Sequence, residues 1–394
     1  MADVVLHASD VGASPQASSN IRHLSRTELP GGGQIVIQGH HAYVGHQNGP
    51  EGTTILDVSD PRKPKIVGRL MVPNELTHTH KVRVVGDLMV TNSEHQPGSG
   101  RRNEFKDAGF RIYDIADPAN PRLVTFVQTF GKGVHRFDLD ESYAYISTEM
   151  EGFVGNTLVI YDIRHPSRPV EVSRWWMHGQ NVGGGEPPHP KGTEHRLHHA
   201  MRSGDQMYAG CWASGVAIID VSDIGQPRTL SHYQYDPPRP EPTHTFLKVP
   251  FPINGRTIAV STEEERPQRG PDAEKPHAAF RTWDVTDPTK PQPLYTYDVP
   301  DDASPYHGRK FRFGAHQLRE HVDKDGLVYV TWFGAGLRII DINDPSHPRE
   351  KGYIIPKPGD GQKAPLTNDV AMDDRGLIYF TDKARGLDVI EFQG

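Results

Sequence analysis

The stretch FRIYDIADPANPRLVTFV, residues 110–127, decides the fold because variants of it recur about every fifty residues along the chain. Each copy holds an apolar, β-rich segment that ends in aspartate, a turn of the DPxxP type and a second β-rich segment. Asp-Pro favours the start of a turn, and the second proline restricts the backbone where the next strand begins. The copies occupy residues 53–70, 110–127, 157–175, 216–233, 280–297 and 337–354.

A second hairpin precedes each copy, as in KVRVVGDLMVT (residues 81–91), which gives four strands per unit, the size of a propeller blade. The seventh unit ends at GLDVIEFQG (386–394) and lacks an outer strand, and NIRHLSRTELP (20–30) resembles the outer-strand phrase of the first unit. We therefore predict an all-β, seven-bladed β-propeller of one domain, residues 1–394. Residues 20–30 are expected to close the ring, which leaves no exposed sheet edge, and residues 1–19 to be flexible.

The composition narrows the function classes. The chain has 394 residues, a net charge of −7, 22 histidines and one cysteine. Its acidic balance argues against a nucleic-acid partner or an anionic membrane surface, and the single Cys211 excludes intrachain disulfides and cysteine-rich metal motifs. No basic, apolar leader and no long apolar run is present, so we expect a cytoplasmic protein with a small-molecule substrate. The sequence does not indicate an oligomeric state.

Histidine recurs at one position of the predicted innermost strands. Because innermost strands line the central channel, residues at one register should form a ring at one height. The aligned positions are Gly33, His80, His135, His199, His244, His316 and Asn368. The alternative is a structural histidine inherited through repeat duplication, but buried imidazoles that face one channel need partners.

Carboxylates follow three of these histidines at the end of the next strand. They are Glu94, Glu149 and Glu263, and the matching positions in the other units are Gln47, Trp212, Trp332 and Asp382. A metal-bound imidazole usually donates its second ring N–H to a carboxylate or a carbonyl. We therefore predict a metal site in which the five histidines supply ligands and the three glutamates orient them. Taken singly, each glutamate could equally be a solvated hairpin end.

Other residues are assigned weaker roles. His78 and His195 are candidates for contact with substrate or a second metal, and His198 is expected to be structural because it would point away from the channel. Further candidate contacts of substrate or metal are Trp212, Trp332, Asn368, Asp382, His307 and Arg309. The long connections fall on one face of the predicted ring, at residues 94–109, 177–197, 263–278, 300–314 and 356–367. That face is the expected active face.

The phrases LVIYD, AIIDVSD and RIYDIADP resemble the LVIVD-repeat family of seven-bladed β-propellers, a resemblance that covers nearly the whole chain and implies fold more than activity. The predicted metal site resembles in layout that of carotenoid cleavage oxygenases, which hold one ferrous ion by four histidines, three of them backed by glutamates. Oligogalacturonate lyases, another seven-bladed group, use a histidine-bound Mn ion for elimination.

Three functions follow from these patterns. The favoured one is a metal-dependent oxidoreductase, a non-haem iron or copper oxidase or oxygenase that acts on a small organic substrate. Fe is the preferred ion, with Cu, Mn or Zn as alternatives, because imidazole suits all of them. The second is a metal-dependent Mn or Zn lyase or hydrolase, and the third a non-enzymatic interaction scaffold. Metal binding separates the first two from the third, and a requirement for O₂ separates the first from the second.

Overall fold

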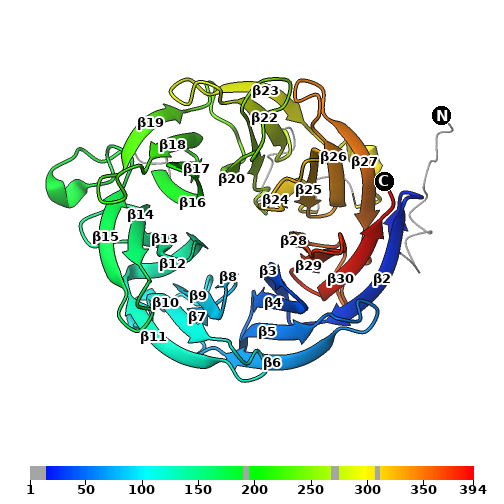
Figure 1. The fold of residues 1–394 in the computed structure, drawn as a ribbon, viewed down its shortest axis with the longest axis horizontal. Helices are drawn as coiled ribbons and strands as arrows, with labels where there is room; N and C mark the ends of the chain where they lie inside the picture. The colour runs from blue at the N-terminus through cyan, green and yellow to red at the C-terminus, as the bar shows by residue number, and fades with distance from the viewer. Residues whose placement is uncertain (1–14, 190–194, 268–274, 307–310) are drawn as a thin grey trace.

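The strands of the molecule are arranged as blades around a central channel (Figure 1). This computed structural model describes residues 15–189, 195–267, 275–306 and 311–394. Within these residues seven antiparallel blades of four strand positions each follow one another around the ring, as the repeat predicted. In the second blade the innermost position is divided between β7 and β8, which both pair with β9.

Each blade begins with its innermost strand at the channel and ends with its outermost strand. Blades one to three are β3 (Gly32–Gln38), β4 (His41–His46), β5 (Glu51–Asp57) and β6 (Lys65–Met71); β7 (Thr77–His78), β8 (Val82–Val85), β9 (Leu88–His95), β10 (Gly109–Asp114) and β11 (Arg122–Gln128); and β12 (Phe130–Leu139), β13 (Tyr143–Glu149), β14 (Asn156–Asp162) and β15 (Val170–Trp175). Blades four and five are β16 (His195–Ser203), β17 (Gln206–Trp212), β18 (Val216–Asp220) and β19 (Arg228–Tyr233); and β20 (Thr243–Lys248), β21 (Ile258–Glu263), β22 (Phe280–Asp284) and β23 (Gln292–Tyr297). Blades six and seven are β24 (Ala315–Leu318), β25 (Leu327–Trp332), β26 (Gly336–Asp341) and β27 (Arg349–Ile355); and β28 (Thr367–Met372), β29 (Ile378–Asp382), β30 (Gly386–Phe392) and β2 (Ile21–Glu28).

The aspartate of each repeat forms the turn between the third and fourth strands. In the second blade the Asp114 carboxylate accepts the backbone N–H of Ala116 at 3.0 Å, and Asp117 accepts that of Ala119 at 3.0 Å. Equivalent bonds to the residue two positions on occur at Asp57, Asp162, Asp220, Asp284 and Asp341. The repeat is thus a turn signal with a hydrogen-bonding cause.

The ring is closed by the N-terminal strand, as the sequence predicted. Strand β2 pairs antiparallel with β30, the third strand of the last blade (Figure 1). Arg26 donates to both oxygens of Asp388, at 2.9 and 2.6 Å, across this pairing. Of the segment expected to be flexible, residues 1–14 lie outside the described part of the chain, whereas Gln16–Ala17 form β1 and pair with β27 of the sixth blade.

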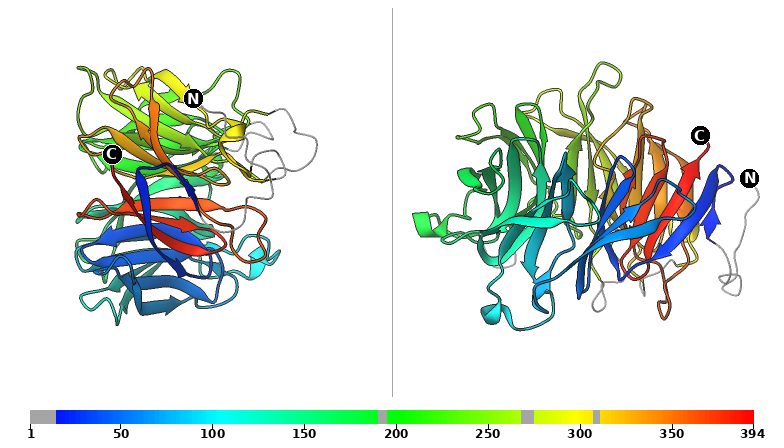
Figure 2. Two further views of the ribbon diagram at one scale, coloured as in Figure 1. Left: turned by 90° about the vertical axis from the view of Figure 1, so that its right-hand side faces the viewer. Right: turned by 60° about the horizontal axis from the view of Figure 1, so that its bottom comes forward.

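The core lies between neighbouring blades. Tyr145 and Ile160 of the third blade, for example, pack against Ala209 and Ile219 of the fourth in one buried apolar cluster. The short 3-10 turns η2 (Arg102–Glu104), η3 (Val182–Gly184) and η4 (Asp301–Ala303) belong to three of the long connections, and η2 and η4 lie on the same side of the ring in Figure 2. No helix in the described part of the chain is long and apolar enough to cross a membrane.

Candidate metal centre

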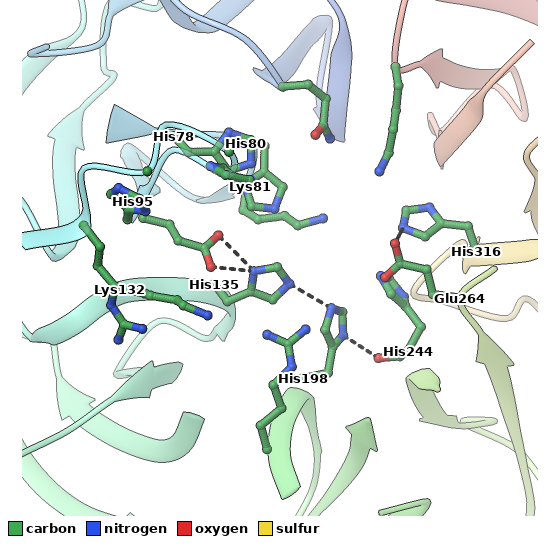
Figure 3. Close-up of a pocket in the computed structure, with 18 residues that line it drawn as sticks. His78, His80, Lys81, His95, Lys132, His135, His198, His244, Glu264 and His316 are labelled. Carbon is green, nitrogen blue, oxygen red and sulfur yellow. Dashed lines mark hydrogen bonds and ion pairs between the residues drawn. The ribbon is translucent and has the colours of Figure 1, made fainter. Parts of the chain in front are cut away.

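A cavity of about 640 Å³ opens at one end of the central channel, and imidazoles make up much of its wall (Figure 3). Six histidines follow one another around it, with successive ring centroids 4.0 to 5.4 Å apart. We call them the histidine arc: His78, His80, His135, His198, His244 and His316. The first long connection also contributes to the wall, through His95, Pro97, Gly98, Gly100 and Arg102.

A bulge at the start of the inner strands aims these side chains. In the third blade Val134 and Arg136 oppose consecutive residues of β13, so His135 stands between them without a partner in the ladder. Thr243 and Thr245 likewise flank His244, and Ala315 and Leu318 span the bulge that holds His316. A bulge redirects a side chain out of the regular alternation, in this case into the channel.

His198 occupies this position in the fourth blade, and the prediction of His199 was therefore wrong. The pairing of β16 with β17 shifts between His195 and His199, so that His199 already lies in regular register opposite Gly210. In the other blades the ring residue is followed by a polar and then an apolar residue, as in His135-Arg136-Phe137. His198-His199-Ala200 fits this pattern, which identifies His198 as the ring residue. The sequence alignment placed the ring position one residue too late.

The residues after the ring positions form a second buried layer, which we call the polar layer: Gln34, Lys81, Arg136, His199, Thr245, Gln317 and Asp369. Arg136 donates its Nε–H to His199 Nδ1 at 3.1 Å, and its guanidinium pairs with Glu320. Arg83 pairs with the other oxygen of Glu320. Burial by itself raises the pKa of Glu320, but Arg83 and Arg136 outweigh it and hold the pKa well below its usual range.

Four imidazoles of the arc have their Nδ1 nitrogen occupied by an acceptor. His135 Nδ1 lies 2.9 and 3.1 Å from the two oxygens of Glu94. His198 Nδ1 lies 2.7 Å from the carbonyl oxygen of His244, and His316 Nδ1 2.5 Å from that of Asn368. A carboxylate or a carbonyl can only accept, so in these three neutral rings the proton is on Nδ1 and the lone pair on Nε2.

His244 has the same tautomer through a hydroxyl. Its Nδ1 lies 3.0 Å from Thr245 Oγ1, which donates its own proton to Gln317 Oε1 at 2.9 Å and so accepts from the imidazole. Burial is the main cause that lowers the pKa of His135, His198, His244 and His316 below the ordinary value, which keeps the rings neutral. Four lone pairs therefore belong to Nε2 atoms of the cavity wall.

Two of these lone pairs face each other. His135 Nε2 and His198 Nε2 are 3.0 Å apart (Figure 3). Two acceptors at this separation repel unless a proton or a cation lies between them, and the lowered pKa values disfavour a proton. Two nitrogens bound at right angles to one ion, each at about 2.1 Å, would be about 3.0 Å apart. The donor set present therefore fits a transition-metal ion.

Glu264 supplies a carboxylate to this set, a residue that the sequence interpretation missed. Its oxygens lie 3.9 Å from both His244 Nε2 and His316 Nε2, and Arg312 pairs with it. Donor atoms of His198, His244 and Glu264 all lie within 4.8 Å of one another, as do donor atoms of His78, His80 and Glu94. The second group is also buried, and His78 Nδ1 has no hydrogen-bond partner among the described residues.

The three predicted glutamates lie in different environments, and only one of them lines the cavity. Glu94 lies in the cavity wall but bonds to His135 of the following blade and not, as expected, to His80 of its own. Glu149 lies outside that wall, where it pairs with Arg102 and accepts the backbone N–H of Lys132 at 2.9 Å. Glu263 points away from the channel, toward Arg239 at 2.9 Å and Arg281 at 2.8 Å. The predicted roles of Glu149 and Glu263 were therefore wrong.

The remaining predicted positions lie as follows. Gln47 and His78 line the cavity, whereas His195 borders a neighbouring one and is hydrogen-bonded through Nδ1 to Ser214 Oγ at 2.7 Å. Trp212 stacks on His198 with centroids 5.2 Å apart. Trp332 lies in the core between the fifth and sixth blades, and the Asp382 carboxylate accepts the backbone N–H groups of Leu366 and Ala384. The residues one position further on lie closer to the channel: Phe333 stacks on His316, and Lys383 lines the cavity. Asn368 acts through its carbonyl on His316, and His307 and Arg309 lie outside the described residues.

Comparison with known proteins supports the fold. The LVIVD repeat family matches residues 32–72, 105–129, 136–175 and 324–354, so the chain carries LVIVD repeats. The WD40 β-propeller domain of Doa1 matches with a TM-score of 0.60 at 8% identity over 95% of this chain and 98% of that one. Saccharomyces cerevisiae Sqt1 matches with a TM-score of 0.55 at 9% identity over 91% and 82%. At such identities the likeness concerns the fold alone. No curated protein sequence matches this chain significantly.

Proposed function

We propose that this LVIVD-repeat propeller is a metal-dependent oxidoreductase whose ion is held by Nε2 of His135, His198, His244 and His316, with Glu264 as a carboxylate donor. The observation that carries the proposal is the common tautomer of the four imidazoles, each fixed by an acceptor at Nδ1. Such partners orient a metal-binding ring and raise its basicity.

The donor set favours iron, with copper as the nearest alternative. Neutral imidazoles with one carboxylate and no thiolate suit both metals. Such an ion supplies one-electron and O₂ chemistry when bound. The chain's own residues hold its ligands in one tautomer and border a cavity that can accept a small organic molecule.

A second candidate is a Mn- or Zn-dependent lyase, which the lysines of the cavity favour. Burial lowers the pKa of Lys383 to about 8, so a fraction of this amine is neutral near pH 7 and can accept a proton from a substrate. Turnover without O₂ and with added Mn or Zn would select the lyase over the oxidoreductase.

Elemental analysis of untagged protein, combined with an EPR spectrum, tests the proposal. We expect about one equivalent of Fe or Cu or more, and a spectrum that changes when O₂ is admitted. Less than about one third of an equivalent of any transition metal, in protein refolded or grown with each metal supplied, would overturn it. Two equivalents would indicate that His78, His80 and Glu94 hold a second ion.

A further inference from the structure

The cavity is cationic although the protein as a whole is acidic. Five cationic side chains belong to its wall, against two carboxylates, Glu94 and Glu264. The cationic residues are Lys81, Arg102, Lys132, Arg196 and Lys383. Burial lowers the pKa of Lys81 to about 7 and that of Lys383 to about 8, so these two amines are only partly charged near pH 7, but the basic side chains still outnumber the two carboxylates before any metal binds. A site of this kind attracts anions.

Arg196 differs from the other arginines around the centre. Arg102 pairs with Glu149, and Arg312 pairs with Glu264. Arg196 has no carboxylate within 4.0 Å among the described residues, and its Nε is buried without a hydrogen-bond partner there. Its guanidinium lies over Trp212, with Cζ 4.2 Å from the ring centroid, which restrains the position of the fork. The Nε–H of this guanidinium has no acceptor within the described part of the protein. A ligand could supply that acceptor and so remove the cost of an unpaired buried donor.

The position of Arg196 joins it to the centre. It lies on β16, two residues before His198, and its charge acts on His135, His198 and Glu94. Arg196 and Lys132 also line a second cavity of about 410 Å³, which shares these two residues with the central one. A ligand group held by both would therefore lie where the cavities meet; Glu149, which pairs with Arg102, also lines the second cavity.

We infer that Arg196 and Lys132 form the subsite for an anionic group of the substrate, and that the substrate is a small organic carboxylate. The inference rests on the proposed function for its use in turnover, but not for binding itself. Arg offers two parallel N–H groups that match a carboxylate, and Lys adds a point charge. A monoanion suits the site better than a dianionic phosphate because Glu94 and Glu264 face the same cavity.

Calorimetric titration of the full-length, chelator-treated protein at low ionic strength tests the subsite. The probes are benzoate and inorganic phosphate, and the variants are Arg196→Gln, Arg196→Lys and Arg174→Gln. Arg174 is the matched control, because it also lies over an aromatic ring, Phe153, but pairs with Glu171 away from the cavity. Far-UV circular dichroism checks that each variant folds.

We expect the Kd for benzoate to rise by at least about tenfold in Arg196→Gln, less in Arg196→Lys, and less than about twofold in Arg174→Gln. Equal benzoate binding in Arg196→Gln and the parent, or no binding to either, would overturn the subsite. Tighter binding of phosphate than of benzoate would overturn the carboxylate assignment. Because the titration uses metal-free protein, absence of metal from the purified chain would refute the proposed function and leave this result readable.

Discussion

His198 and His199 are neighbours in the sequence, yet they belong to two layers of the channel with opposite chemistry. His198 presents its Nε2 to the cavity, 3.0 Å from another nitrogen lone pair. His199 is fully buried in the polar layer, where its Nδ1 accepts from Arg136. The histidine arc gathers lone pairs that face one another, whereas in the polar layer the charge of Arg136 is paired with Glu320, which also pairs with Arg83. The charge pairs of the polar layer support the channel, whereas the facing lone pairs of the histidine arc are arranged to receive a ligand.

Substitution of each of the two adjacent histidines is the most direct test of the difference between the layers. Replacement of His198 by alanine removes a proposed ligand, so we expect metal affinity to fall by more than about 100-fold, beyond the loss typical of an orienting partner. Replacement of His199 by alanine should leave metal content unchanged and lower the free energy of unfolding by about 1–3 kcal/mol, because Arg136 loses an acceptor. Metal content and urea unfolding measure the two effects. Loss of metal in the His199 variant alone would reverse the assignment of the layers.

Glu320→Gln tests whether the polar layer carries structural charge pairs. Removal of one partner of a buried pair leaves the guanidinium groups of Arg83 and Arg136 without their counter-charge, and we expect a loss of about 3–5 kcal/mol in unfolding free energy. Asp323→Asn is the control, because Asp323 is only half-buried, with 42% of its side chain exposed, and its pair with Arg319 should be worth about 0–1 kcal/mol. Chemical denaturation gives both values, and equal losses in the two variants would show that Glu320 has no special role.

Glu94→Gln tests the orienting carboxylate of the histidine arc. The amide presents weaker acceptors to His135 Nδ1, so we expect metal affinity to fall by about 10- to 100-fold while the fold is retained. Glu149→Gln, outside the cavity wall, should change metal affinity by less than about twofold. Competition with a chromophoric chelator measures both, and a larger effect at Glu149 would favour the sequence-based assignment over the observed geometry.

The smallest expected effect is on the pH dependence of the unfolding free energy, to which the Glu320 charge pairs beside the polar layer should contribute. The pKa of Glu320 is lower in the folded protein than the unfolded value of about 4.3, so its stabilisation is complete above that pH. It is lost progressively as the pH falls toward the folded pKa. Between about pH 4.5 and 3, Glu320→Gln should therefore show a shallower fall in unfolding free energy, by up to about 1.4 kcal/mol per pH unit. An unchanged slope would mean that other carboxylates dominate acid unfolding.

Much of the fold could be predicted because the DPxxP turn repeats with its own local cause, the bond from aspartate to the N–H two residues on. The residues of the candidate metal centre were harder to predict, because a bulge at the start of an inner strand changes which of two adjacent residues faces the channel. The alignment correctly placed His80, His135, His244 and His316 in the cavity wall, but in His198-His199 both candidates are histidine and the choice was wrong. The run Glu263-Glu264-Glu265 posed the same ambiguity, and Glu264 was missed. Arg196 carried no repeating signal, because its lack of a partner is a property of three-dimensional packing.

The pairing of β2 with β30 has a consequence for how the centre is made in the cell. Residues Ile21–Glu28 are synthesised before all other strands of the ring blades, and they cannot complete the seventh blade until Gly386–Phe392 have followed. Lys383 and the carbonyl of Asn368 that orients His316 also belong to this final blade. A nascent chain without the seventh blade therefore has no complete set of oriented imidazoles, and the proposed ion should bind only after that blade has been synthesised. A chain that lacked β2 would lose its closure and with it the centre, although no residue of β2 lines the cavity.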